Sequence, residues 1–127
     1  MATSFPAFGE FLVKIQAVGP QGAGAAEAAT AWKTLSQSAA SDLPTLLAAI
    51  DDEKPLAANY IRSAIEAIAD RETDKLPADR LEKFALETKN DPRARRLAFE
   101  LLLRVNPKAE SRLLPQMLND PSVELRR

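Results

Sequence analysis

Apolar residues recur every three or four positions along most of this chain, which is the spacing of one face of an α-helix. The clearest stripe predicts a helix over 92–105, and its apolar members are Ala94, Leu97, Ala98, Leu101, Leu102 and Val105. Similar stripes predict helices over 5–18, 24–38, 43–50, 54–71, 81–86 and 113–118, with a further helix starting at 121. No segment alternates at the period of two that a half-buried strand shows. The pattern predicts an all-α fold of about seven to eight helices.

The helix over 92–105 also has apolar residues outside its main stripe, at Phe99 and Leu103. A helix that buries two faces has neighbours on more than one side, as internal helices of a stacked array do. This favours a layered arrangement over a simple four-helix bundle.

Prolines mark where several of these helices begin. Asp91-Pro92, Asn106-Pro107 and Asp120-Pro121 each have the form of an N-cap followed by proline at the first helical position, where a missing N–H costs nothing. Asp42 precedes Pro44 in the same way, with the proline still inside the first turn. The glycine-rich stretch 19–24 predicts a loop between the first two helices.

The chain also repeats itself. Residues 62–68 align with 96–102 at an offset of 34, with identical arginine, alanine and glutamate and with apolar residues matched in kind. Residues 43–47 resemble 114–118 at an offset of 71, about two repeats. Repeats of this length are typical of stacked helical hairpins.

Three features follow one another along the chain: Leu-Pro-Thr-Leu-Leu at 43–47, Asp51-Asp52, and the arginine–alanine–glutamate pattern of 62–68. Together they resemble the HEAT-like repeat, including the type first noticed in phycobilisome lyases. The end of the chain, 119–127, looks like the turn and opening of another second helix. The resemblance implies an α-solenoid of antiparallel helix pairs.

The same resemblance suggests how the chain is divided. We expect one domain over 1–127, with a divergent N-terminal hairpin at 1–40 and repeats at 41–75, 76–106 and 107–127, the last incomplete. An array cut a few residues into a helix leaves an apolar face uncovered, whereas natural arrays end in a polar cap. We therefore expect the chain to be part of a longer protein.

Composition removes several classes of chemistry. The 127 residues include no cysteine and no histidine, which excludes disulfide frameworks, thiol nucleophiles, Cys/His zinc sites and Ser-His-Asp triads. The acidic run 51–53 has neither the alternating spacing nor the glycine turn of a calcium loop, so a helix-capping turn is the better interpretation. Asp70, Glu72 and Asp74 lie beside Arg71 and Lys75, which favours a solvated charged surface over a pair of catalytic carboxylates.

The N-terminus has no basic segment and no apolar run long enough for a signal peptide or a membrane span. We expect no membrane partner, and the cytoplasm is the default compartment. Trp32 lies on an apolar stripe and is expected in the core, whereas Tyr60 could serve either the core or a binding surface.

Charge is distributed unevenly although the net charge is −1. The basic residues of the C-terminal third are Arg93, Arg95, Arg96, Arg104, Lys108, Arg112, Arg126 and Arg127. Acidic residues interleave them, and this part of the chain has no tryptophan or tyrosine on which a base could stack. Nucleic-acid binding is therefore a weaker hypothesis than protein binding.

We expect a non-enzymatic protein–protein interaction or scaffolding module that needs no cofactor and binds a protein partner or neighbouring domains of its own chain. Two alternatives stay open: a bilin-lyase-like protein that handles a chromophore or cofactor, and a nucleic-acid-binding HEAT-like domain. The offset of 34 also pairs polar positions of the helix predicted over 54–71 with polar positions of the helix predicted over 92–105. These polar positions form the predicted partner-facing surface. Its residues are Asn59, Arg62, Glu66, Asp70, Arg93, Arg96, Glu100 and Arg104.

Overall fold

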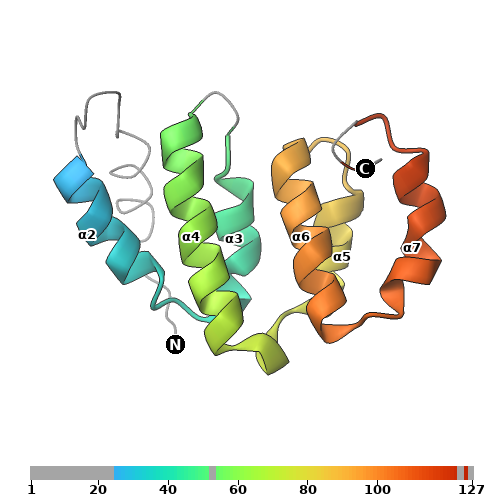
Figure 1. Ribbon diagram of the computed structural model, residues 1–127, viewed down its shortest axis with the longest axis horizontal. Helices are drawn as coiled ribbons and strands as arrows, with labels where there is room; N and C mark the ends of the chain where they lie inside the picture. Colours follow the sequence, from blue (N-terminus) through green and yellow to red (C-terminus); the bar gives the residue numbers. More distant parts are fainter. Residues whose placement is uncertain (1–24, 52–53, 123–124, 126–127) are drawn as a thin grey trace.

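The computed structural model describes residues 25–51, 54–122 and 125 (Figure 1). These residues form six α-helices and two short 3₁₀ turns, with no strand among them. The α-helices are α2 (Ala25–Leu35), α3 (Leu43–Ala48), α4 (Pro55–Arg71), α5 (Ala78–Leu86), α6 (Pro92–Val105) and α7 (Ala109–Leu118), and the turns are η2 (Ala40–Asp42) and η3 (Thr73–Lys75).

The all-α prediction is confirmed, with fewer helices in the described ranges than the seven to eight expected. The helix predicted over 5–18 and the loop predicted at 19–24 lie outside the described residues. The helix predicted to start at 121 does not start there, because Pro121 and Ser122 form a bend, whereas Leu125 is helical. The bounds of α4 and α6 match the prediction to within one residue.

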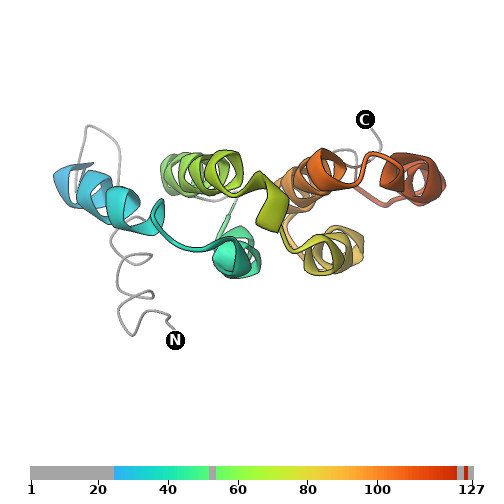
Figure 2. The ribbon, with the colours of Figure 1, turned by 90° about the horizontal axis from the view of Figure 1, so that it is seen from below.

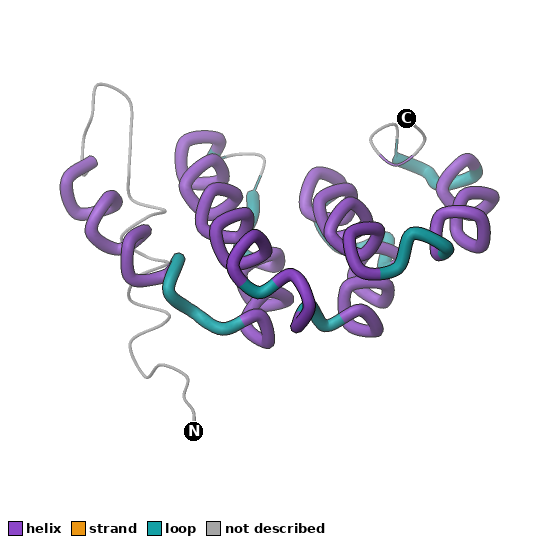
Figure 3. Tube along the Cα trace, turned by 60° about the horizontal axis from the view of Figure 1, so that its bottom comes forward, coloured by secondary structure: helices purple, strands orange, loops and turns teal. Residues whose placement is uncertain are grey.

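Two rows of helices form the molecule. In Figures 1 and 2, α2, α4, α6 and α7 lie in one row, and α3 and α5 form a second row on one side of it. Short turns connect successive helices (Figure 3). Each short helix packs against the long helix that follows it, α3 against α4 and α5 against α6, and α6 also packs against α3. The half-buried Phe99 and Leu103, outside the main stripe of α6, also pack against the core.

The predicted cap is confirmed for α6 and is wrong for α7, and at α3 it makes no side-chain hydrogen bond to the helix, although that helix begins at Leu43 as predicted. The Asp91 carboxylate accepts hydrogen bonds from the backbone N–H groups of Arg93 (2.9 Å) and Ala94 (3.4 Å), so it caps α6 as predicted. The expected cap at Asn106 is wrong: its N–H instead completes the last turn of α6 by donating to Leu102 O (2.9 Å), and α7 begins at Ala109. Asp42 precedes α3, but its carboxylate accepts from the N–H of Ala39 (3.3 Å) because Asp42 itself belongs to the preceding turn.

The apolar stripes meet in one continuous core. On α4 the core takes Ile61, Ala64, Ile65 and Ile68, all fully buried, and on α6 it takes most of the predicted stripe. Residues 43–47 of α3 contribute three fully buried leucines, because this short helix lies among α4, α5 and α6.

The stripe predicted for α7 is only partly correct. Leu113 and Met117 are buried, whereas Leu114 is 44% exposed and Leu118 is 57% exposed. The two segments aligned at the offset of 71 therefore differ, because all three leucines of the α3 segment are fully buried whereas two leucines of the α7 segment are exposed. Among the described elements, α7 packs chiefly on α6, which accounts for its single buried face.

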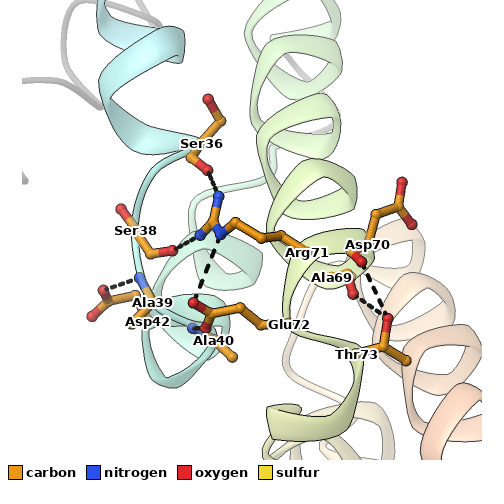
Figure 4. A network of polar contacts seen from close by, with 10 residues as sticks. All are labelled: Ser36, Ser38, Ala39, Ala40, Asp42, Ala69, Asp70, Arg71, Glu72 and Thr73. Carbon is orange, nitrogen blue, oxygen red and sulfur yellow. Dashed lines mark hydrogen bonds and ion pairs between the residues drawn. The ribbon is translucent and has the colours of Figure 1, made fainter.

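A network of hydrogen bonds connects the end of α4 to the residues that follow α2 (Figure 4). The guanidinium of Arg71 donates to the backbone carbonyl oxygens of Ser36 (2.7 Å) and Ser38, the two residues that follow α2 closely. The neighbouring Glu72 carboxylate accepts from the N–H of Ala40 (2.8 Å). Glu72 was expected in a solvated charged surface, so this prediction is corrected: it is half-buried and holds a backbone turn.

We expect Leu101→Ala to lower the free energy of unfolding by about 2–5 kcal/mol, because Leu101 is fully buried in the middle of α6 and its truncation leaves a cavity. Urea denaturation followed by circular dichroism at 222 nm measures the change. The matched control is Leu118→Ala on the exposed side of α7, for which the loss should stay below about 0.5 kcal/mol. Equal losses for the two variants would contradict the assignment of the buried face.

Candidate functional site

The predicted partner-facing surface lies entirely on α4 and α6, and we call its eight residues the α4–α6 polar face. Most of its side chains are exposed, and Glu66 and Arg96 are half-buried. Positions four apart on a helix turn by about 40° around its axis. Each set of polar residues therefore follows a gently winding stripe along its helix.

One ion pair joins the two helices of this face. Asp70 Oδ1 accepts a hydrogen bond from Arg104 Nη1 at 2.8 Å, near the C-terminal ends of α4 and α6. These residues are 34 positions apart, which is the repeat offset found in the sequence. The pair therefore connects equivalent points of successive helix pairs across the surface.

Two further ion pairs lie within the helices. Arg62 Nε is 3.5 Å from Glu66 Oε2, and Arg96 Nε donates to Glu100 Oε2 at 3.2 Å. Exposed pairs at this spacing contribute only tenths of a kcal/mol to helix stability. They do define the pattern of charge on the surface. Both helices present an arginine and, four residues later, a glutamate.

A wide, shallow depression of about 570 Å³ lies at the C-terminal end of this face. Its lining comes from the ends of α4 and α6 and from η3: Asp70, Arg71, Thr73, Asp74, Arg104 and Val105. Thr73 is fixed there by the hydrogen bond that its hydroxyl donates to Ala69 O (2.7 Å). Side chains of both charges line the depression.

Arg95 is the largest departure from the sequence-based interpretation. It was counted among the basic residues of the C-terminal third, yet it is 1% exposed. Its Nε donates to the backbone carbonyl of Ala85 (2.9 Å), its Nη1 donates to Asp120 Oδ1 (3.0 Å), and its Nη2 donates to Asp120 Oδ2. Asp120 Oδ1 also accepts from the N–H of Ser122 (2.8 Å).

The sequence carried a signal for this burial. Arg95 lies three residues before Ala98 and seven before Leu102, so it falls on the apolar stripe of α6 and not on its polar side. A charged residue on a buried stripe needs a counter-charge. The sequence could not identify that partner, because Asp120 is 25 residues away.

We expect Asp120→Ala to lower the free energy of unfolding by about 3–5 kcal/mol, since it leaves the Arg95 guanidinium buried without its counter-charge. Chemical denaturation measures the loss. An Asp74→Ala variant, which removes an exposed carboxylate, is the matched control and should change little. The double variant Arg95→Met/Asp120→Ala should recover part of the loss, and a strictly additive further loss would contradict the buried-charge explanation.

Another ion pair links α5 to α7. Arg112 on α7 donates to both oxygens of Glu82 on α5, at 2.7 Å each. These hydrogen bonds, together with the positive charge of Arg112, hold the pKa of the Glu82 carboxyl below its ordinary value of 4.5 against the opposing effect of desolvation. The same hydrogen bonds raise the pKa of Arg112.

This pair makes stability depend on pH. Because the folded-state pKa of Glu82 is lowered, its contribution is present above the unfolded-state pKa and is lost as the pH falls through the folded-state value. We expect Glu82→Gln to lose less stability than the wild type between about pH 5 and pH 3. Urea denaturation across this range measures the difference, with Glu110→Gln, an exposed acid on α7, as the control. Parallel curves for wild type and Glu82→Gln would contradict the linkage.

The two single-copy aromatic residues both pack against the core and are partly buried. The expectation of core packing for Trp32 is confirmed in this sense. Its indole Nε1 is buried and has no hydrogen-bond partner in the described part of the chain. The structure therefore gives Trp32 and Tyr60 a packing role.

Within the described ranges, no group of three or more acidic side chains is placed to hold a metal ion. Nor does any described helix have the length and apolar character required to cross a membrane. Comparison of the chain with protein-family models, with curated proteins and with solved structures gave no match in any of the three searches.

Proposed function

We propose that this protein is a non-enzymatic interaction module, built as a HEAT-like α-solenoid, that binds a protein partner or a neighbouring domain through the α4–α6 polar face. The observation that carries the proposal is the repetition of exposed polar residues on two successive long helices, connected at equivalent positions by Asp70 and Arg104. A stack of helix pairs exposes a continuous surface of this kind without any reactive centre.

Charge on the α4–α6 polar face favours a protein over a nucleic acid. Its arginines alternate with Glu66, Asp70 and Glu100, and three of them form ion pairs with these acids. A nucleic-acid surface needs cations that neutralise phosphates, and acids beside each arginine oppose that. A protein surface with charges of both signs can match the pattern and obtain specificity from it.

Burial of Arg95 leaves one fewer cation at the surface to bind a nucleic acid. Its guanidinium is neutralised by Asp120 inside the molecule, so it contributes no charge to the surface. The basic excess of the C-terminal third is therefore smaller at the surface than in the sequence.

Charge reversal tests the proposal. A binding partner would first be isolated on immobilised full-length protein and then titrated in purified form by isothermal calorimetry. We expect Arg96→Glu/Arg104→Glu to weaken its binding about tenfold or more, because both reversals place like charges against a complementary surface. The matched control, Lys33→Glu/Lys108→Glu, reverses two exposed lysines outside α4 and α6 and should bind as the wild type does.

Unchanged affinity of the Arg96→Glu/Arg104→Glu variant would exclude this face as the binding surface. A shifted absorption band on mixing the protein with a bilin would favour the chromophore-handling alternative instead. Salt-dependent retention on heparin that is lost in the same variant would favour nucleic-acid binding. Circular dichroism of each variant establishes that its helices are intact before binding is compared.

A further inference from the structure

A second surface feature lies in the other row of helices, between α3 and α5. It is an open groove of about 280 Å³, which we call the α3–α5 groove, and it is lined by Pro44, Arg80, Lys83, Phe84, Glu87 and Asn90. Three of these residues, at positions 80, 83 and 84, follow the i, i+3, i+4 spacing of one face of α5, and Glu87 follows the end of that helix. One side of α5 therefore faces the groove along about 6 Å of its axis.

The floor of the groove is apolar and rigidly held. Phe84 is half-buried and packs against the core, while its backbone carbonyl accepts a hydrogen bond from Asn90 Nδ2 (3.1 Å). Pro44, in the first turn of α3, supplies the opposite wall. Because both walls belong to helices of the core, the groove keeps its shape without a ligand.

The rim carries two cationic side chains that form no ion pair within the described structure. Arg80 and Lys83 are exposed, and neither forms an ion pair with a described residue, whereas Arg62, Arg71, Arg95, Arg96, Arg104 and Arg112 all do. Glu87, the acid at the other end of the groove, accepts a local hydrogen bond from the N–H of Lys89 (3.3 Å). The groove thus has a cationic end and an apolar middle.

We propose that the α3–α5 groove is a docking site for a peptide segment with one large apolar anchor residue and acidic residues on one side of it. The volume is below the roughly 300 Å³ at which small-molecule pockets begin, which suits a single side chain better than a whole ligand. An apolar anchor in a pocket with a polar rim is the usual arrangement of a binding hot spot. Acidic neighbours of the anchor would pair with Arg80 and Lys83.

This inference does not depend on the proposed function, because the α3–α5 groove shares no residue with the α4–α6 polar face. The probes are two fluorescein-labelled peptides with a central Leu-Phe pair, one with three glutamates before the pair and one with three glutamates after it. Fluorescence anisotropy with the full-length protein measures their affinity. We expect at least one peptide to bind, and Arg80→Glu/Lys83→Glu to weaken that binding about tenfold or more.

Both substituted side chains are exposed, so the variant should fold, and circular dichroism checks this. Lys108→Glu, an exposed lysine outside the groove, is the matched control and should leave the affinity unchanged. Replacing the central Leu-Phe pair of the peptide by two serines should abolish binding, since the glutamates alone do not fill the groove. Amide NMR shifts of the protein on addition of the peptide should concentrate on α3 and α5.

Several results would overturn the inference. These are no binding of either peptide up to about 1 mM, equal binding by the charge-reversed variant, and retained binding by the serine peptide. Amide shifts confined to α4 and α6 would place the peptide on the other surface. Sedimentation that shows a dimer disrupted by Arg80→Glu/Lys83→Glu would assign the groove to a second copy of the chain instead.

Discussion

The buried contact between Arg95 and Asp120 is the constraint on which the C-terminal half of the structure depends. A guanidinium without solvent is tolerated only if its donors are satisfied, and here a carboxylate and the carbonyl of Ala85 satisfy them. The three groups belong to the end of α5, the start of α6 and the turn after α7. Their positions are therefore fixed relative to one another, because any shift of one segment would strand a buried charge.

The remaining polar links are exposed, and their role is different. Arg71 holds the turn after α2, Asp70–Arg104 joins α4 to α6, and Glu82–Arg112 joins α5 to α7. Each is too accessible to solvent to supply much stability. The apolar core supplies stability, and these links select how successive helix pairs are aligned. The Asp70–Arg104 pair spans 34 residues, which is also the offset at which 62–68 align with 96–102 in the sequence.

Helix positions could be predicted because an apolar stripe is a local property of the chain. The stripes of α4 and α6 predicted most of the buried residues of both helices, and the eight polar positions do lie on these helices. Leu56, the first residue of the stripe predicted for α4, is an exception because it is 43% exposed. The same reasoning was wrong for Leu114 and Leu118, since burial there depends on which neighbours α7 has. It was also wrong for Arg95, whose surroundings include a carboxylate from a distant turn. The α3–α5 groove was missed for the same reason: it combines residues from two helices and a turn that only the fold brings together.

The two surfaces differ in what a partner must displace. On the α4–α6 polar face, Arg62, Arg96 and Arg104 already have acidic neighbours, so a partner must match or replace existing pairs, which limits affinity and rewards specific complementarity. At the α3–α5 groove, Arg80 and Lys83 have no ion-pair partner among the described residues, so an acidic segment gains their attraction without breaking anything. Its apolar anchor also finds a wall formed in advance by Pro44 and Phe84, which reduces the ordering cost of binding. A short peptide, with little area to bury, can therefore use the groove, whereas the polar face requires a broad and preorganised partner.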